Sequence, residues 1–246
     1  MVNNDLHIIM PVKDSVEMAE KAILAIIHSG HKVCVYDDNS LPENAKRLDN
    51  IAKENNIPVI HISDITNHPS PNYRTVLQLA QQQALLENKH LVIIESDVII
   101  QSDTLCRMAS KVEDGVGMIA AITTDENGTF NFPYHYARKG YCRTKGKTTI
   151  ATHKRFSFCC TLLTNQLLHA ADFQLLDSSK NWYDVTISHW SIDLGFRNLL
   201  MLDNPVLHFP HASRPWKRLK YTNPLLYYWR KITLNKDRIC SQWLVS

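Results

Sequence analysis

Short apolar runs alternate with segments of helical periodicity through the first half of this chain. In those segments the apolar residues recur every three or four positions, which is the spacing of one buried helix face. Alternation of this kind is typical of a mostly parallel sheet that is covered by helices on both faces. We therefore predict an α/β fold with a Rossmann-like, three-layer α/β/α arrangement. The strands are expected at 6–10, 33–36, 57–62, 91–95 and 116–122.

The composition is that of an ordinary folded protein. The 246 residues suffice for one large α/β domain, and the formal net charge of +3 is too small to indicate nucleic-acid binding by itself. No apolar run approaches the roughly 18 residues that can span a bilayer. The six cysteines form no C-x-x-C pair and the first residues do not resemble a secretory signal, so we expect free thiols and a cytoplasmic location.

The alternation stops after about residue 123. Residues 123–150 are polar and include a basic stretch, 138–147, which we expect to form a mobile loop. Further strands are expected at 156–163 and 205–209. Basic and aromatic residues are interleaved near the C-terminus. The economical interpretation is one domain over 1–214, followed by a basic, aromatic appendage over 215–246.

Acidic and polar residues follow two of the expected strands. Asp37-Asp38-Asn39-Ser40 comes after one apolar run and Glu95-Ser96-Asp97 after another. In open α/β sheets, ligands bind beyond the carboxyl ends of the strands. Paired carboxylates there suit a divalent cation bound to substrate phosphates. Ser40 is also expected to cap the next helix, and Asp14 and Ser15 the helix after the first strand.

The end of the first strand excludes two common nucleotide-binding motifs. It reads Met10-Pro11-Val12-Lys13-Asp14 and contains no glycine. Dinucleotide-binding and P-loop proteins both need a glycine-rich loop at this point, because their backbone approaches the phosphates closely. The sequence therefore argues against NAD-dependent enzymes and kinases.

These motifs together resemble glycosyltransferase family 2, whose members have the GT-A fold. The stretch 8–14 is similar to the family's first strand and its Pro-Val-Tyr-Asn turn, with Lys13-Asp14 in place of Tyr-Asn. The stretch 35–40 resembles its Val-Asp-Asp-Gly/Asn-Ser motif. Glu95-Ser96-Asp97 resembles its Asp-x-Asp motif, with glutamate for the first aspartate.

The resemblance implies a GT-A catalytic domain over 1–214, with a nucleotide-binding half (1–100) and an acceptor and metal half (101–214). Asp97 is the implied metal ligand, and Ser96 is implied to lie near the ribose. Arg74 falls where the family often has an Arg-Asn-x-Gly helix start, which it matches poorly. The nucleotide-sugar-binding residues implied in this way are Pro11, Val12, Asp14, Asp38, Arg74, Glu95 and Ser96.

A base is needed to take the acceptor proton in an inverting transfer. The family places it in a Glu-Asp-x-Asp-Leu-x-x-Arg pattern. Here the corresponding stretch is 189–197, in which Trp190-Ser191 replaces Glu-Asp while Asp193 and Arg197 match. Asp193 is the first candidate and Asp184 the second, with His189 a third. An Asp193–Arg197 ion pair is the structural alternative for Asp193.

A histidine near 208–214 is the implied third metal ligand. His211 is the first candidate because it lies beyond the expected strand, and His208 is the second. Imidazole and carboxylate together suit Mn²⁺ or Mg²⁺. Arg214 and the basic loop 138–147 could meet the donor phosphates, with the loop acting as a lid.

The sequence thus predicts a metal-dependent, inverting glycosyltransferase. It would move a sugar from a nucleotide-diphosphate sugar to a saccharide or lipid-linked hydroxyl acceptor, in surface polysaccharide or glycolipid synthesis. The alternatives are a catalytically degenerate nucleotide-sugar binding protein and a sugar-nucleotide nucleotidyltransferase. The appendage suits either peripheral contact with the inner face of a membrane or a homo-oligomer interface, and we expect no nucleic-acid partner.

Overall fold

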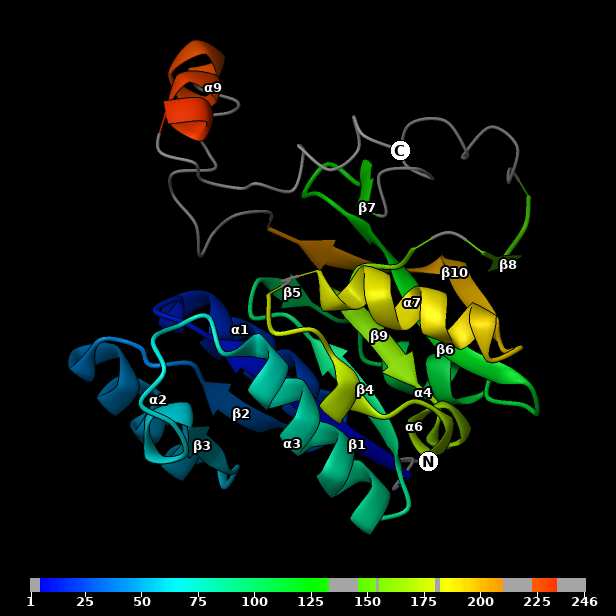
Figure 1. Cartoon of the computed structure of the whole chain (residues 1–246), viewed down its shortest axis with the longest axis horizontal. Coiled ribbons are helices and arrows are strands. Elements are labelled where there is room, and N and C mark those ends of the chain that lie inside the picture. Colours follow the sequence, from blue (N-terminus) through cyan, green and yellow to red (C-terminus); the bar gives the residue numbers. More distant parts are fainter. Residues whose placement is uncertain (1–4, 133–145, 154, 180–181, 210–222, 234–246) are drawn as a thin grey trace. The chain divides into compact units, whose positions relative to one another are not determined.

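The computed structural model describes residues 5–132, 146–153, 155–179, 182–209 and 223–233. The chain divides into two compact units after Phe209. The first unit contains the whole sheet and is shown in Figure 1. In the second unit the described residues form a single helix, α9 (Pro224–Thr233). None of the helices within the described ranges is both long and apolar enough to cross a bilayer.

One mixed sheet forms the centre of the first unit. β1 pairs in parallel with β2 and β4, and β2 with β3. β9 is antiparallel to β4 and β6, while β10 is parallel to β6. The strands in sheet order are β3 (Val59–His61), β2 (Cys34–Asp37), β1 (Leu6–Val12), β4 (His90–Ile94), β9 (Cys160–Leu163), β6 (Val116–Thr124), β10 (Arg197–His208) and β5 (Val98–Ile99), with β7 (Phe130–Phe132) beside β6 and β8 (Thr149–Thr152) beside β10.

The α/β class is confirmed, and the five strands expected in the first half are present as β1, β2, β3, β4 and β6. Parallel pairing prevails in that half, as predicted. From β6 to β9, by contrast, the described residues contain no helix. Successive parallel strands need a long crossover, usually a helix, so antiparallel pairing is the simpler arrangement there.

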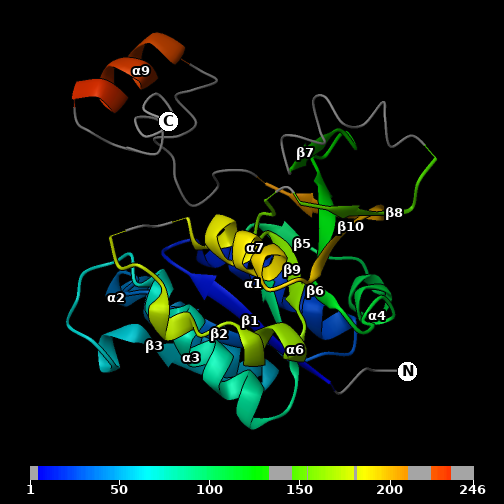
Figure 2. The ribbon, with the colours of Figure 1, turned by 45° about the vertical axis from the view of Figure 1, so that its right-hand side comes forward.

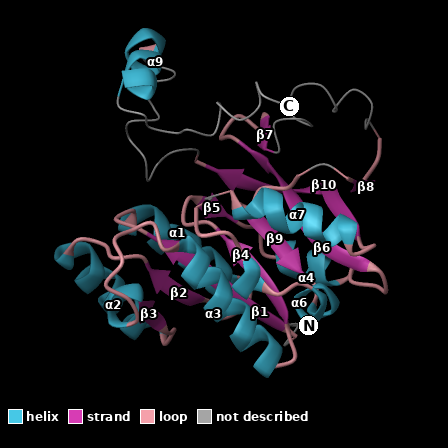
Figure 3. Ribbon diagram, in the orientation of Figure 1, coloured by secondary structure: helices cyan, strands magenta, loops and turns pink. Residues whose placement is uncertain are grey.

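Helices cover both faces of the sheet (Figures 1, 2 and 3). One core cluster joins the sheet to α1 (Val16–His28), α2 (Pro42–Asn55) and α4 (Thr104–Ala109). The other joins it to α3 (Tyr73–Leu86), α6 (Asn165–Ala170) and α7 (Tyr183–Asp193). Ile8 and Met10 belong to the first cluster and Ile9 to the second, since successive side chains of a strand point to opposite faces. The three-layer arrangement follows from this alternation.

Candidate functional site

The carboxyl ends of six strands meet at one edge of the sheet. These strands run in the same direction, because β9 is antiparallel to both of its neighbours; they are β1, β2, β3, β4, β6 and β10. Glu95-Ser96-Asp97 follows β4, and His208 ends β10. Cys159 directly precedes β9, and its carbonyl accepts a hydrogen bond from the Glu95 amide at 3.0 Å. The edge therefore gathers residues that are far apart in the sequence.

Glu95, Cys159 and His208 form a group that could hold a metal ion. One ligand atom from each, namely a carboxylate oxygen, the thiol sulfur and an imidazole nitrogen, lies within 4.8 Å of the other two. Asp97 adjoins this group, with Oδ1 3.8 Å from Nε2 of His208. Oxygen, nitrogen and sulfur donors converging on one point suit a divalent cation. We call Glu95, Asp97, Cys159 and His208 the strand-end cluster.

The ring of His208 is oriented by its neighbours. Its Nδ1 lies 3.3 Å from Oδ1 of Asn131, and that oxygen also accepts a hydrogen bond from the Thr123 hydroxyl. Because Oδ1 is an acceptor, it receives the proton on Nδ1, and Nε2 is then the ring nitrogen that faces Asp97 and could meet a cation. An outer partner of this kind commonly fixes the tautomer of a metal-binding histidine. His208, the second candidate in the sequence, thus lies where it could serve as a ligand, whereas His211 lies outside the described residues.

The thiol of Cys159 is neutral without a cation. Burial raises its pKa well above the usual range, and the charge of Glu95 raises it further. The thiol lies 3.5 Å from Oε2 of Glu95 and 3.0 Å from the Ser157 hydroxyl. No motif in the sequence pointed to Cys159, because its place beside β4 depends on a pairing between distant segments.

Asp38 anchors the loop that leads into α3. It is 8% exposed and accepts hydrogen bonds from the Asn72 amide (3.0 Å), the Asn72 side chain (2.8 Å) and the Ser70 hydroxyl (2.7 Å). A carboxylate can accept about four hydrogen bonds, so Asp38 has room for one donor from a ligand. Pro11 and Val12 lie beside it, paired in register with Tyr36 and Asp37.

The helix caps predicted for α1 and α2 are wrong. Neither Asp14 nor Ser15 caps α1 through its side chain. Oδ1 of Asp14 accepts hydrogen bonds from the Leu41 amide (2.7 Å) and the Asn44 side chain (3.1 Å) at the start of α2. The Ser40 hydroxyl, expected to cap α2, accepts the Asp14 amide at 2.9 Å instead. Asp14 has a positive φ of 57°, which turns its amide and carboxylate toward the loop after β2. Contact between the two loops replaces local capping.

Asp184 lies at the same end of the fold as the strand-end cluster. It stands in the first turn of α7. One turn further along the helix, the Ser188 hydroxyl accepts a hydrogen bond from the Phe156 amide at 3.0 Å, which joins α7 to the segment leading into Cys159. Burial raises the pKa of the Asp184 carboxyl to about 6, although its hydrogen bond from the Val185 amide and the nearby charge of Arg155 oppose the shift. A carboxyl with this pKa can take up a proton near neutral pH.

Asp193, the first candidate for the base, is not brought to this edge. It is exposed and ends α7 at the opposite end of the helix. After a short turn, the Arg197 amide donates to the Gly115 carbonyl just before β6, so Asp193 lies near the amino ends of the strands. Arg197 pairs with Glu113 at 2.8 Å and not with Asp193. The structure thus favours the second candidate, Asp184, while His189 is exposed in mid-helix.

Arg74 lies between the two halves of the predicted site. It stands in the first turn of α3, and its charge acts on the Tyr183 hydroxyl at the start of α7. The ring of Tyr73 lies 6.4 Å from those of Phe158 and Tyr183. The starts of α3 and α7 therefore converge near the segment before Cys159. Arg214, most of the basic loop (138–145) and parts of the appendage (215–222 and 234–246) lie outside the described residues.

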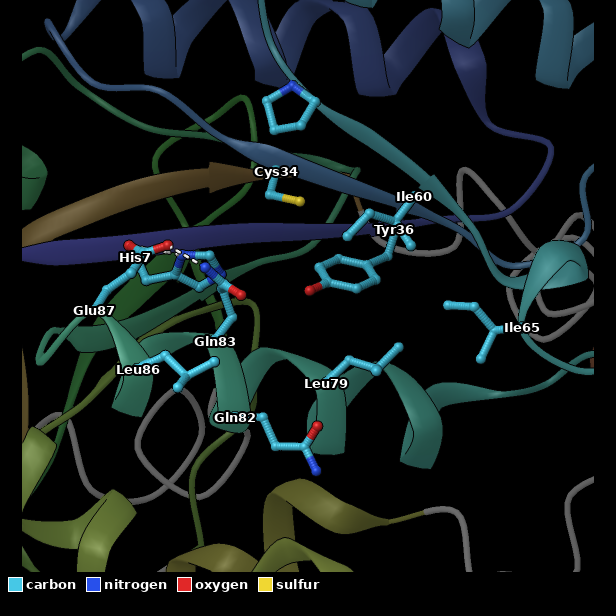
Figure 4. Close-up of a pocket in the computed structure, with 11 residues that line it drawn as sticks. His7, Cys34, Tyr36, Ile60, Ile65, Leu79, Gln82, Gln83, Leu86 and Glu87 are labelled. Carbon is cyan, nitrogen blue, oxygen red and sulfur yellow. Dashed lines mark hydrogen bonds and ion pairs between the residues drawn. The ribbon is translucent and has the colours of Figure 1, made fainter.

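A separate cavity of about 370 Å³ lies between α3 and the strands β1, β2 and β3 (Figure 4). His7 and Glu87, paired at 3.5 Å, lie at one end of it, at the start of β1 and the end of α3. Tyr36, Ile60 and Leu79 form apolar walls. None of the residues predicted to bind donor or metal lines this cavity, so it is distinct from the strand-end cluster.

Comparison with known proteins agrees with this architecture. The model of the family described as glycosyl transferase family 2 matches residues 7–169. No curated protein sequence matches the chain significantly. Several solved structures share the fold.

The mannosyltransferase PcManGT from Pyrobaculum calidifontis, in complex with GDP-Man and Mn²⁺, is 14% identical with a TM-score of 0.60, covering 93% of this chain and 64% of that one. TarS 1-349 from S. aureus is 14% identical with a TM-score of 0.60, and the match covers 88% of this chain and 63% of that one. GalNAc-T7 with UDP, GalNAc and Mn²⁺ is 12% identical with a TM-score of 0.59, and the match covers 82% of this chain and 43% of that one. The chain thus spans less than two thirds of each of these structures.

Proposed function

The chain belongs to glycosyl transferase family 2, and we propose that it transfers a sugar from a nucleotide-diphosphate sugar to a hydroxyl acceptor with the help of a divalent cation. One observation carries the proposal. The strand-end cluster, with its carboxylate, imidazole and thiol donors, lies at the same sheet edge as Asp38. A nucleoside site and a cation site at one edge are what a nucleotide-diphosphate donor requires.

The nucleoside is assigned to the carboxyl ends of β1 and β2. Pro11 and Val12 would line its position, and the remaining acceptor capacity of Asp38 would take a donor from the base or ribose. Ser96, buried between the two acidic residues, would adjoin the ribose. Arg74 and Asp14 would act from the flanks, the latter by holding the two loops together. The complex of PcManGT with GDP-Man supports a donor of this class.

The cation is assigned to Glu95, Asp97 and His208. The donor set fits, because two carboxylates and an oriented imidazole converge in a largely buried place. When bound, the cation supplies positive charge that stabilises a diphosphate leaving group. The Mn²⁺ in the PcManGT and GalNAc-T7 structures supports this assignment.

Asp184 is assigned as the base. Its carboxyl would take the proton of the acceptor hydroxyl while that oxygen attacks the anomeric carbon from the face opposite the diphosphate, with inversion. A pKa of about 6 leaves most of the carboxyl ionised at neutral pH and still gives it useful basicity. The exposed position of Asp193 at the far end of α7 does not suit this role.

The acceptor is assigned to a saccharide or lipid-linked saccharide. The helix α9 exposes Leu225, Tyr228 and Trp229, whereas Tyr227 is buried. Apolar and aromatic side chains exposed on one helix suit the interface of a membrane, where a lipid-linked acceptor would be found. Surface polysaccharide or glycolipid synthesis at the inner face of a membrane is the context that we propose. An oligomer interface would expose the same side chains.

A donor panel tests the proposal. UDP-, GDP- and dTDP-sugars are incubated with Mn²⁺, and release of the nucleotide diphosphate is measured with and without saccharide acceptors. Asp184→Asn should reduce turnover by about a hundredfold or more and leave nucleotide binding intact. Asp193→Asn, the matched control on the same helix, should behave as wild type. Cation-dependent nucleotide binding without turnover of any donor would favour a binding protein instead.

A further inference from the structure

Cys159 introduces a sulfur donor into a site otherwise made of oxygen and nitrogen. Its thiol is 3% exposed and is grouped with ligand atoms of Glu95 and His208. We infer that Cys159 binds the cation directly, as a thiolate, and that the site therefore prefers a borderline cation such as Zn²⁺ or Co²⁺ to Mg²⁺. The inference rests on the proposed function in that the site is the one assigned to the donor's cation.

The distances suit coordination by both side chains. A thiolate at about 2.3 Å and a carboxylate oxygen at about 2.0 Å from one cation, at a tetrahedral angle, stand about 3.5 Å apart. The separation between Sγ of Cys159 and Oε2 of Glu95 is 3.5 Å. The grouping of these atoms with the His208 nitrogen within 4.8 Å allows a third ligand at the same centre. Little rearrangement is then needed for the cation to enter.

The backbone holds the thiol in this place. The Cys159 carbonyl accepts the Glu95 amide at 3.0 Å, so the two residues face each other across the β4–β9 pair. The neighbouring thiol of Cys160 instead lies 3.8 Å from Sδ of Met108, within the apolar core. Cys159 thus differs from its neighbour in meeting two carboxylates and an imidazole.

The chemistry of the donor set decides the class of cation. Mg²⁺ prefers oxygen ligands in octahedral geometry, and a thiolate offers it little. Zn²⁺ and Co²⁺ bind imidazole and thiolate well and accept mixed N, O and S sites. Coordination forms the bond from sulfur to the cation, and the thiol proton is released to solvent. Asn131, which orients His208, supports the nitrogen ligand from outside.

Cobalt spectroscopy of the full chain tests the inference. Co²⁺ bound to a thiolate gives a charge-transfer band in the near ultraviolet, which no oxygen or nitrogen ligand produces. The wild type should show this band, and Zn²⁺ should displace Co²⁺ far more readily than Mg²⁺ does. Cys159→Ser should abolish the band and weaken Co²⁺ binding at least about tenfold. Cys106→Ser, at a half-buried cysteine in α4, should leave both unchanged.

Two results would overturn the inference: Co²⁺ binding without the band in the wild type, or an unchanged band in Cys159→Ser. If Cys159→Ser does not fold, Glu95→Gln decides, because it keeps the thiol and removes its partner. In Glu95→Gln both the affinity for Co²⁺ and the intensity of the band should fall. An unchanged band would mean that Co²⁺ is bound by another cysteine. If instead the proposed function is wrong and the site binds no cation, the wild type would bind neither Co²⁺ nor Mn²⁺ at this site.

Discussion

Nδ1 of His61 lies 2.9 Å from Oδ2 of Asp37, a carboxylate that is almost fully buried at the end of β2. On its other side, Nε2 of the same ring lies 2.9 Å from Oδ1 of Asp49 in α2. His61 therefore links β3, β2 and α2. Because Asp38 directly follows Asp37, the link also fixes the strand end that is assigned to the nucleoside.

This link should make stability depend on pH. Burial opposes the charged form of His61, but hydrogen bonds and charge from Asp37 and Asp49 outweigh it and raise its pKa. The pKa of His61 in the folded protein thus lies above its value of about 6.5 in the unfolded chain. The stabilisation that protonated His61 provides is therefore fully present below about pH 6.5, and it is lost as the pH rises through the pKa of the folded protein. His61→Gln should lower the free energy of unfolding by about 1 kcal/mol at pH 5.5 and by less at pH 8.5.

Urea unfolding at the two pH values measures this difference. His153→Gln, at an exposed histidine after β8, is the control and should change stability equally at both. An equal loss for His61→Gln at both pH values would show that the ring acts only through packing or neutral hydrogen bonds.

Asp38 should serve stability and nucleotide binding together. Asp38→Ala removes the acceptor of both Asn72 hydrogen bonds and of the Ser70 hydroxyl, leaving buried donors unsatisfied. The free energy of unfolding should fall by about 1–3 kcal/mol. Calorimetry should also show weaker nucleotide binding. Asp64→Ala, at an exposed aspartate near the same loop, should change neither quantity. Unchanged nucleotide affinity in a folded Asp38→Ala protein would remove Asp38 from the site.

The assignment of Asp184 predicts the acidic limb of the pH–rate profile. kcat/KM should fall as pH drops through about 6, because the base is then protonated. The charge of Arg155 lowers the pKa of Asp184, so Arg155→Gln should move the limb to higher pH. A limb that stays in place in Arg155→Gln would point to another titrating group.

Gly117 should be essential for packing α7 on the sheet. A Cβ at this position would contact the Ser191 hydroxyl and lie 2.8 Å from Cβ of Phe196. Ser191 in turn donates to Oδ1 of the buried Asn198 at 2.6 Å. Gly117→Ala should therefore destabilise the fold by about 1–3 kcal/mol, which thermal or urea unfolding can measure. If Gly117→Ala is as stable as the wild type, α7 can move away from the sheet at little cost in free energy.

Features encoded locally were predicted best from the sequence. The strands of the first half stand out as apolar runs, and the acidic residues at their ends lie at the predicted sheet edge, because the ends of parallel strands meet there. Features that depend on distant pairing were missed. Cys159 joins Glu95 only because β9 inserts beside β4, and Asn131 reaches His208 from β7.

Helix boundaries account for other differences between expectation and structure. Aligning 189–197 with a family pattern made Asp193 the first candidate for the base, whereas α7 begins at Tyr183 and ends at Asp193, so that Asp184 lies at its start. Similarly, Ser40 and Asp14 have the residue types of helix caps, but they bond each other's loops. In both cases contacts between distant segments, which the local sequence does not show, determined where the side chain lies.

If the strand-end cluster binds a cation together with the donor diphosphate, nucleotide affinity must depend on that cation. Calorimetric titration of the chain with GDP and UDP, with and without Mn²⁺, measures this dependence in the wild type and in Asp97→Asn. Mn²⁺ should strengthen binding of one nucleotide to the wild type by about tenfold or more, and Asp97→Asn should remove this gain. Nucleotide affinity that is the same with and without Mn²⁺ in both proteins would contradict binding of the cation at the strand-end cluster.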